Sequence, residues 1–253
     1  MVSAPVGFQC RECVGLAAAQ RPTVQTPVGG AIPSRPTVTY ILIGLTVIAF
    51  LLQLMAGIDE SSVQWGMWPA RVAVNGAWWL LVTSAFLHGS FLHIAFNMYV
   101  LFALGPVLER VLGHSRYLVL YLASAVGGGV ASFWFSEVNA VSVGASGAIF
   151  GLMGALVVAG RRLRYDVRQV LILLGINLVI GFIAPGVDWR AHLGGLVTGA
   201  LVAAVLVFAP RAHRLLWQLL GIGAILGVLI LLFSLRVMEL SEFLAPISPV
   251  LST

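Results

Sequence analysis

The chain has 253 residues, of which 60% are hydrophobic and 9% are charged, and its mean hydropathy is +1.01. A soluble domain carries about 25% charged residues, so this composition excludes a soluble globular protein and indicates an all-α polytopic membrane protein. The net charge of +5 comes from arginines that lie between apolar segments rather than on one face, which argues against nucleic-acid binding.

Residues 1–36 are rich in Pro, Gly, Ala and Thr, and no charged start precedes an apolar core, so no cleavable signal peptide is expected. Cys10 and Cys13 form a C-x-x-C pair in this tail. A structural zinc site needs four ligands, and no second pair or nearby histidine accompanies them. Two interpretations stay open, a reduced exposed pair and half of a zinc ribbon completed elsewhere. We predict no metal site within the chain and no cofactor.

Seven apolar stretches are long enough to cross the ~30 Å hydrocarbon core of a bilayer as helices. They cover residues 38–55, 88–108, 116–135, 145–160, 168–184, 189–209 and 215–236. If the spans alternate in direction, one side holds Arg11, Arg21, Arg35, Arg110, Arg116, Arg161, Arg162, Arg164, Arg168, Arg211 and Arg214. The other side holds Arg71, Arg190 and Arg236. The positive-inside rule then predicts a multi-pass protein of the cell membrane with a cytoplasmic N-terminus and an extracytoplasmic C-terminus.

The connection after the first span, residues 56–87, is long, poor in charge and rich in tryptophan. Its tryptophans are Trp65, Trp68, Trp78 and Trp79. Tryptophan favours the membrane–water interface. We therefore expect this loop to lie partly in the outer interface and to pack laterally against the helices.

Two polar strings interrupt the apolar stretches. Ser146 lies in the string Gly144-Ala145-Ser146-Gly147, and His192 opens His192-Leu193-Gly194-Gly195 after Ala191. Polar side chains are costly at membrane depth and usually mark a functional site. A serine and a histidine are also the minimal pair for nucleophilic acyl transfer, because the imidazole takes the hydroxyl proton.

Depth along the helices brings more polar groups to the same layer. With a rise of about 1.5 Å per residue, Ser146 lies roughly 22 Å above the arginines that end its span. The second span carries His88, His93 and Asn97; by the same rise, Asn97 lies roughly 18 Å up and His93 about 6 Å higher. His192 lies near the outer start of the sixth span. Three helices thus deliver serine, histidine and asparagine side chains to one outer layer.

Glycines next to these residues predict close helix packing. Gly147 and Gly151 on the fourth span, and Gly195 and Gly199 on the sixth, form small-x-x-x-small patterns that let helix backbones approach. Such packing would bring the Ser146 hydroxyl towards His192. Phe150, one turn after Ser146, would then support the imidazole ring from beneath.

No carboxylate is available to orient the histidine. The acidic residues are Glu12, Asp59, Glu60, Glu109, Glu137, Asp166, Asp188, Glu239 and Glu242. None of them falls mid-span at the depth of His192, so the sequence predicts a Ser–His dyad rather than a triad. The best donors for an oxyanion are His93, the Asn97 amide and the backbone N–H of Ser146.

These residues resemble the rhomboid family of intramembrane serine proteases. The resemblance rests on GASG around Ser146, AHLGGLVTG around His192, the His88, His93 and Asn97 pattern, and the Glu109-Arg110 end of that span. It implies a cytoplasmic tail over 1–36, a six-helix rhomboid core over 37–210, and a seventh transmembrane helix with an extracytoplasmic tail over 211–253.

The resemblance also implies residue roles. Ser146 would be the nucleophile, His192 the general base, and His93 and Asn97 the oxyanion-binding residues. The supporting residues would be Gly144, Gly147, Phe150, His88, Gly195 and Gly199. The family cleaves transmembrane segments of other membrane proteins near their outer ends, so the implied partners are such substrates and the lipid bilayer, and not nucleic acid.

One departure from the family concerns the tryptophan-rich loop. The family often has Trp-Arg where this chain reads Trp79-Leu80, which predicts altered anchoring of the loop rather than lost catalysis. All catalytic candidates lie within residues 37–210, so we expect residues 1–30 to be dispensable for cleavage.

Two other functions compete with proteolysis. A catalytically silent relative that binds membrane helices would be expected to lose Ser146 or His192, and both are present. A transporter or channel would also place polar residues in spans, but no intramembrane acidic residue or inverted repeat is seen.

Overall fold

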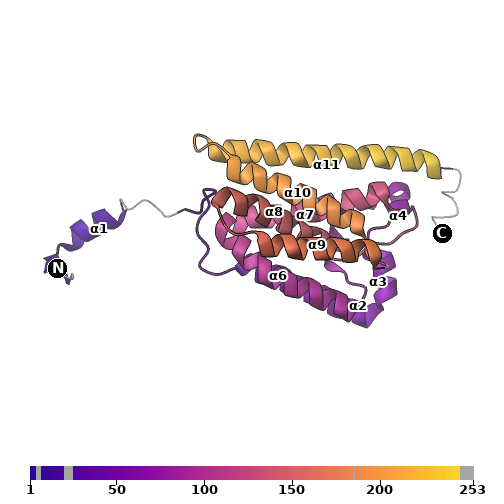
Figure 1. Cartoon of the computed structure of the whole chain (residues 1–253), viewed down its shortest axis with the longest axis horizontal. Coiled ribbons are helices and arrows are strands. Elements are labelled where there is room, and N and C mark those ends of the chain that lie inside the picture. The colour runs from indigo at the N-terminus through magenta and orange to yellow at the C-terminus, as the bar shows by residue number, and fades with distance from the viewer. Residues whose placement is uncertain (4–6, 20–24, 185, 246–253) are drawn as a thin grey trace.

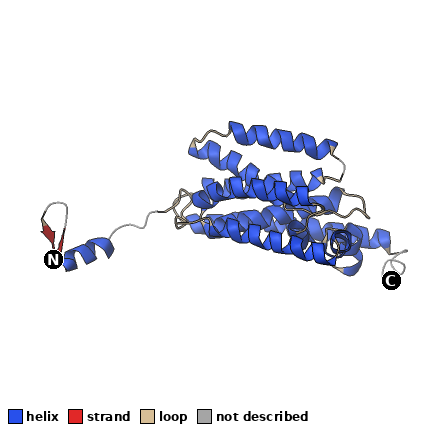
Figure 2. Ribbon diagram, turned by 90° about the horizontal axis from the view of Figure 1, so that it is seen from below, coloured by secondary structure: helices blue, strands red, loops and turns tan. Residues whose placement is uncertain are grey.

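The computed structural model describes residues 1–3, 7–19, 25–184 and 186–245, and it is dominated by helices that run side by side (Figure 1). Within these ranges the only paired strands are β1 (Val2–Ser3) and β2 (Phe8–Gln9), which form a short antiparallel hairpin near the N-terminus (Figure 2). Helix α1 (Arg11–Ala19) follows this hairpin. Arg21, which the sequence assigned to the cytoplasmic tail, and residues 246–253 of the outer tail lie outside the described residues.

Seven helices correspond to the seven apolar stretches. They are α2 (Thr37–Ala56), α6 (Phe91–Leu112), α7 (His114–Phe135), α8 (Ser146–Leu163), α9 (Arg168–Ile183), α10 (Trp189–Phe208) and α11 (Arg214–Leu244). By length and composition, six of those found in the described part of the chain can cross a membrane, and α9 is a shorter apolar helix of 16 residues. The predicted all-α polytopic fold with a seventh, C-terminal helix is confirmed, and α11 runs along the outer edge of the bundle (Figure 1).

The start of the second span was predicted wrongly. The sequence placed His88 inside it, but α6 begins at Phe91, because Ser90 caps the helix and its Oγ accepts a hydrogen bond from His93 N at 3.2 Å. A serine cap satisfies one of the free N–H groups of the first turn. His88 therefore belongs to the preceding loop, where its backbone N–H donates to Gln53 Oε1 at 2.9 Å.

The tryptophan-rich loop is helical in short pieces and packs against the side of the bundle. It contains α3 (Ile58–Trp65), α4 (Pro69–Asn75), α5 (Leu80–Thr83) and the 3₁₀ helix η1 (Ser84–Phe86). Leu80 is fully buried in an apolar cluster that joins this loop to α7 and α11. Its other buried members are Met67, Ala70, Val72, Ala73, Ala77, Leu81, Val130, Phe133, Leu229, Leu240 and Leu244. An apolar side chain thus anchors the loop where the family often has arginine.

Glycines set the distance between α8 and α10. A Cβ on Gly195 would overlap the carbonyl group of Gly147, and a Cβ on Gly199 would overlap that of Gly151. The two helix backbones are therefore in direct contact at two successive turns, as small-x-x-x-small patterns permit. Both contacts lie close in sequence to Ser146 and His192.

At the end of the bundle that carries most of the arginines, the buried carboxylate of Glu109 in α6 contacts the starts of α2 and α7. It accepts hydrogen bonds from two backbone N–H groups in the first turn of α2, those of Val38 and Thr39, each at 2.9 Å, and from Thr39 Oγ1 at 2.7 Å. His114, at the start of α7, contacts it through Nδ1 at 2.5 Å. A carboxylate near the N-terminus of α2 also complements the helix dipole.

Part of the predicted N-terminal tail belongs to the bundle. Residues 26–30 form a turn in which Thr26 N donates to Gly30 O at 2.8 Å and Gly30 N to Thr26 Oγ1 at 2.9 Å. Val28 is only 1% exposed and packs in the main apolar core, and its carbonyl accepts from Gln218 Nε2 at 3.1 Å. The packed region therefore starts before residue 37, where the sequence had placed the boundary.

This turn sharpens the expectation for the tail. Deleting residues 1–24, or replacing Cys10 and Cys13 with serine, is expected to leave unfolding unchanged. Deleting residues 1–30 also removes Val28, whose burial is worth about 1.5–3 kcal/mol, so the free energy of unfolding should fall by about that amount. Thermal unfolding in detergent measures both deletions side by side. Equal melting temperatures for the two would show that the turn contributes nothing.

Candidate active site

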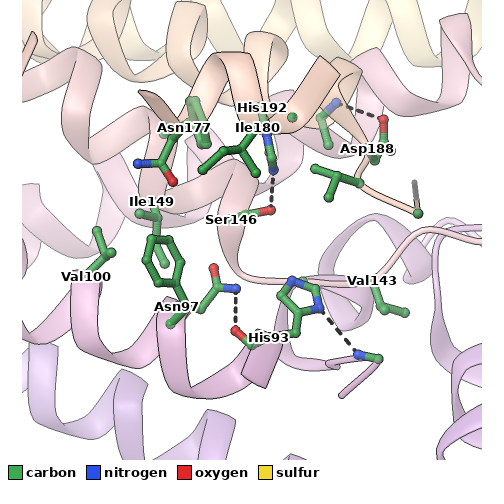
Figure 3. Close-up of a pocket in the computed structure, with 18 of the residues that line it drawn as sticks. His93, Asn97, Val100, Val143, Ser146, Ile149, Asn177, Ile180, Asp188 and His192 are labelled. Carbon is green, nitrogen blue, oxygen red and sulfur yellow. Dashed lines mark hydrogen bonds between the residues drawn. The ribbon is translucent and has the colours of Figure 1, made fainter. Parts of the chain in front are cut away.

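Ser146 and His192 face each other across the contact between α8 and α10. His192 Nε2 lies 2.8 Å from Ser146 Oγ, which is hydrogen-bonding distance, and Figure 3 shows the two side chains pointing towards one another. Ser146 is the first residue of α8, so its backbone N–H is one of the free donors of that helix. His192 lies in the first turn of α10 and is 6% exposed. The pair is placed so that the imidazole can take the hydroxyl proton.

The imidazole of His192 is held by packing. The Phe150 ring stacks on it with centroids 4.2 Å apart and an interplanar angle of 11°. On another side, a Cβ added to Gly181 of α9 would lie 3.1 Å from His192 Nδ1, so α9 packs closely against the ring at this glycine. Among the described residues Nδ1 has no hydrogen-bond partner. Ring contacts, rather than a carboxylate, fix the orientation of this histidine.

Asp188 caps the helix that carries His192 and makes no hydrogen bond to the imidazole ring in the structure. It caps α10, because its Oδ1 accepts from the backbone N–H groups of Arg190 at 3.1 Å and Ala191 at 3.2 Å. Its Oδ2 accepts from Ser132 Oγ of α7 at 2.5 Å. From the sequence, Asp188 was judged only as a possible partner for the imidazole, and it was rejected because of its depth. The structure gives it a positioning role one turn before His192.

Removing this cap gives a direct test. We expect Asp188→Ala to lower kcat/KM for peptide cleavage roughly 10–100-fold, because a displacement of about 1 Å at the reacting atoms costs about that much. Asp188→Asn keeps an oxygen for the backbone and should stay close to the wild type. The control is Asp166→Ala, since Asp166 Oδ1 also accepts from a backbone N–H at the start of a helix, that of Arg168 in α9, at 2.9 Å. Equal losses in Asp166→Ala and Asp188→Ala would contradict a role specific to α10.

His93 and Asn97 line the opposite side of the site and offer donors to it (Figure 3). His93 Nδ1 lies 3.4 Å from Gly89 N and accepts its hydrogen, which leaves the ring hydrogen on Nε2. Asn97 Nδ2 donates one hydrogen to His93 O at 2.9 Å, and its second hydrogen remains available. The two side chains lie on one face of α6, four residues apart.

Gly144 brings these donors close to Ser146. Its φ of +138° is a conformation that favours glycine. A Cβ at this position would lie 2.9 Å from His93 Nε2 and 3.5 Å from Ser146 Oγ, so a side chain here would crowd both groups. Its backbone N–H donates to Ser84 O at 2.9 Å, which fixes the loop that leads into α8.

A cavity of about 540 Å³ lies in front of Ser146 and His192. Its walls come from α6, α8, α9, α10 and the loops before α6, α8 and α10. Asn177 of α9 also lines it (Figure 3). Its Nδ2 donates to Leu173 O at 2.8 Å. The sequence analysis missed Asn177, although a single asparagine in the apolar run of α9 was a usable signal, since polar residues in spans usually mark a site.

The remaining predicted site residues support the site from outside the cavity. The His88 ring is fully buried and meets the His93 ring edge-on, with centroids 4.9 Å apart. Gly147, Gly195 and Gly199 form the backbone contacts between α8 and α10. None of these four residues lines the cavity.

The described residues contain no group of three or more His, Cys, Asp or Glu side chains that could hold a metal ion. Cys10 and Cys13 are exposed free thiols. Backbone hydrogen bonds from Cys13 and Glu12 lower the pKa of the Cys10 thiol. The prediction that the chain binds no metal or cofactor remains a prediction.

Fold and site together define a polytopic membrane protein with a serine and a histidine paired inside a helix bundle. The family model described as Rhomboid domain matches residues 75–209, which is more than half of the chain. The chain therefore belongs to the rhomboid family.

Several named relatives are similar to it. The chain is 38% identical over 207 residues to Rhomboid protease GluP of Bacillus subtilis (strain 168), covering 77% of this chain and 40% of that protein. It is 36% identical over 138 residues to Putative rhomboid protease YdcA of the same organism, covering 53% of this chain and 69% of that protein. It is 27% identical over 210 residues to Rhomboid protease AarA of Providencia stuartii, covering 70% of this chain and 74% of that protein. The chain thus spans less than half the length of the first of these relatives.

Proposed function

We propose that this protein is an intramembrane serine endopeptidase that cleaves transmembrane segments of other membrane proteins. The observation that carries the proposal is the 2.8 Å contact between Ser146 Oγ and His192 Nε2 at the edge of a cavity within the bundle. Three relatives named as rhomboid proteases, one of them putative, support the same reaction class.

The proposed reaction follows the two-step acyl transfer of serine hydrolases. Ser146 Oγ attacks the scissile carbonyl while His192 Nε2 takes the hydroxyl proton. His192 then gives this proton to the leaving amine as the peptide bond breaks and the acyl-enzyme forms. A water molecule attacks the ester in the second step, with His192 again as the base, and releases Ser146.

The negative charge on the carbonyl oxygen requires donors that are already in place. His93 Nε2–H, the second hydrogen of Asn97 Nδ2 and the backbone N–H of Ser146 supply them. The N-terminus of α8 adds its partial positive charge at the same place. Such donors act strongly in a site with little water, because the local dielectric constant is low.

The position of the site along the helices suggests where substrates are cut. Ser146 opens α8, and Arg161 and Arg162 end it, so the site lies at the end of the helix away from these arginines. If the arginine-rich end is cytoplasmic, as the positive-inside rule predicts, the protein cleaves near the outer ends of its substrates. The N-terminus is then cytoplasmic and the C-terminus is extracytoplasmic.

Purified protein incubated with a fluorescent single-span substrate tests this proposal. We expect two products whose new ends, read by mass spectrometry, lie within the outer half of the span. Asp166→Ala, remote from the site, serves as the active control. Binding of the substrate without any cleavage by the wild-type protein would favour the silent, helix-binding relative instead.

A further inference from the structure

Three arginines converge on a second cavity, at the opposite end of the bundle from Ser146. The cavity measures about 460 Å³ and is lined by Arg116 of α7, Arg211 of the α10–α11 connection and Arg214 of α11. Gln25, Gly29 and Leu215 complete its lining. Nothing in the proposed proteolytic reaction uses these residues.

No acidic side chain neutralises this arginine cluster. In the described part of the chain, the ion pairs are Glu109 with His114 and Arg236 with Glu239, and neither involves the cluster. All nine acidic residues of the sequence lie within the described ranges. Three like charges around one cavity repel one another, so a bound anion would stabilise the arrangement.

The guanidinium group of Arg116 is also held in place. Arg116 Nε donates to Gln218 Oε1 at 2.9 Å. Gln218 is only 2% exposed and is itself fixed, since its Nε2 donates to the carbonyl oxygens of Val28 and Leu206, both at 3.1 Å. Only Nε of Arg116 is used in this way, so its terminal amino groups remain free to meet a ligand.

Glycines make room for the arginine side chains. A Cβ on Gly29 would lie 3.1 Å from Arg214 NH1, and a Cβ on Gly30 would lie 2.9 Å from Arg116 NH1. The turn that carries these glycines is the one that Val28 anchors in the core. Arg116 and Arg214 therefore form a packed wall of the cavity, and Arg211 completes the cluster from the exposed connection between α10 and α11.

We propose that this arginine cavity binds a phosphate oxyanion, carried by the headgroup of an anionic phospholipid. Guanidinium groups match phosphate oxygens with paired N–H donors. The cavity lies where membrane-spanning helices end, which is the level of lipid headgroups, and basic pockets between such helices bind anionic lipids. Leu216 and Leu219 follow the cavity residue Arg214 in the first turns of α11. They are 52% and 60% exposed and offer apolar surface to acyl chains.

Native mass spectrometry of the purified protein in detergent tests whether the cavity binds an anionic phospholipid. We expect phosphatidylglycerol to bind more tightly than zwitterionic phosphatidylcholine. Arg211→Gln, Arg214→Gln and Arg116→Gln should each weaken phosphatidylglycerol binding about five-fold, since each basic residue near anionic lipid contributes about 1 kcal/mol. Arg110→Gln is the matched control, because Arg110 is exposed in the last turn of α6 and does not line the cavity.

Inorganic phosphate separates the two sources of the anion. If phosphate, compared with chloride at equal ionic strength, raises the melting temperature of the wild type and displaces the lipid, the cavity takes free phosphate and the oxyanion chemistry stands. If phosphate has no effect while phosphatidylglycerol binds, the ligand is the lipid headgroup.

The proposal is overturned if Arg211→Gln and Arg214→Gln bind phosphatidylglycerol and phosphate as the wild type does. Arg211 is exposed and makes no hydrogen bond in the structure, so its replacement tests binding without endangering the fold. The measured quantities are lipid binding and the melting temperature, and neither depends on proteolysis.

Discussion

Replacing Ser146 or His192 with alanine is expected to abolish cleavage, with kcat lower by roughly 10⁴–10⁶-fold in each variant. The reason is that the hydroxyl and the imidazole act as one unit at 2.8 Å, so either residue alone cannot perform the proton transfer. The double variant should be no slower than the single ones. Single-turnover cleavage of a labelled transmembrane substrate measures all three proteins.

The fold offers an internal check on this result. Ser146→Ala removes one oxygen atom and should leave the melting temperature in detergent within a degree or two. His192→Ala leaves Phe150 without its stacking partner, so a somewhat lower melting temperature is expected from that variant. Turnover near the wild-type rate by either single variant would exclude the assignment of the pair as nucleophile and base.

Loss of the Asn97 side-chain amide is expected to cost about 10²–10³ in kcat, the usual effect of removing one oxyanion donor. The hydrogen bonds of Asn97 favour such a role, because one Nδ2 hydrogen is donated to His93 O and the other is free to reach the cavity. KM should change little, since this hydrogen bond strengthens mainly in the transition state. Steady-state kinetics with one substrate separates kcat from KM.

His93 provides the matching variant. His93→Ala should also lower kcat, and because His88 stacks edge-on against His93, it should lower the melting temperature more than Asn97→Ala does. A purely structural role for Asn97 predicts the opposite pattern, a large loss of stability together with normal kcat in the folded fraction. That pattern would refute the oxyanion assignment.

The sequence was informative where a local pattern determined the structure. The glycines beside Ser146 and His192 predicted the close approach of α8 and α10, because a small-x-x-x-small pattern permits backbone contact and the structure has that contact. The expected place of Phe150 followed from its position one turn after Ser146, which only requires α8 to be helical. The ends of α2, α9 and α10 were also close to those predicted, whereas α11 continues to Leu244, beyond the predicted end at residue 236.

Long-range partners could not be predicted from sequence. Val28 lies in a segment whose Pro and Gly content suggests a disordered tail, and its partner Gln218 is 190 residues away. The start of α6 depended on a choice between His88 and Ser90, and only the hydrogen bond from His93 N decides it. Asn177 was visible as a polar residue, but which way it faces depends on how α9 packs.

The glycine contacts between α8 and α10 also bear on how the site responds to heat. Gly147 follows Ser146 directly, and Gly195 lies within one turn of His192, so backbone contact fixes the spacing of the two helix segments that carry the pair. Glycine has no side-chain rotamers, so none is lost on packing and none becomes populated on warming at this contact. The distance between the α8 and α10 backbones at the site should therefore stay constant up to the temperature at which the helices separate, and activity should then disappear in a single cooperative step.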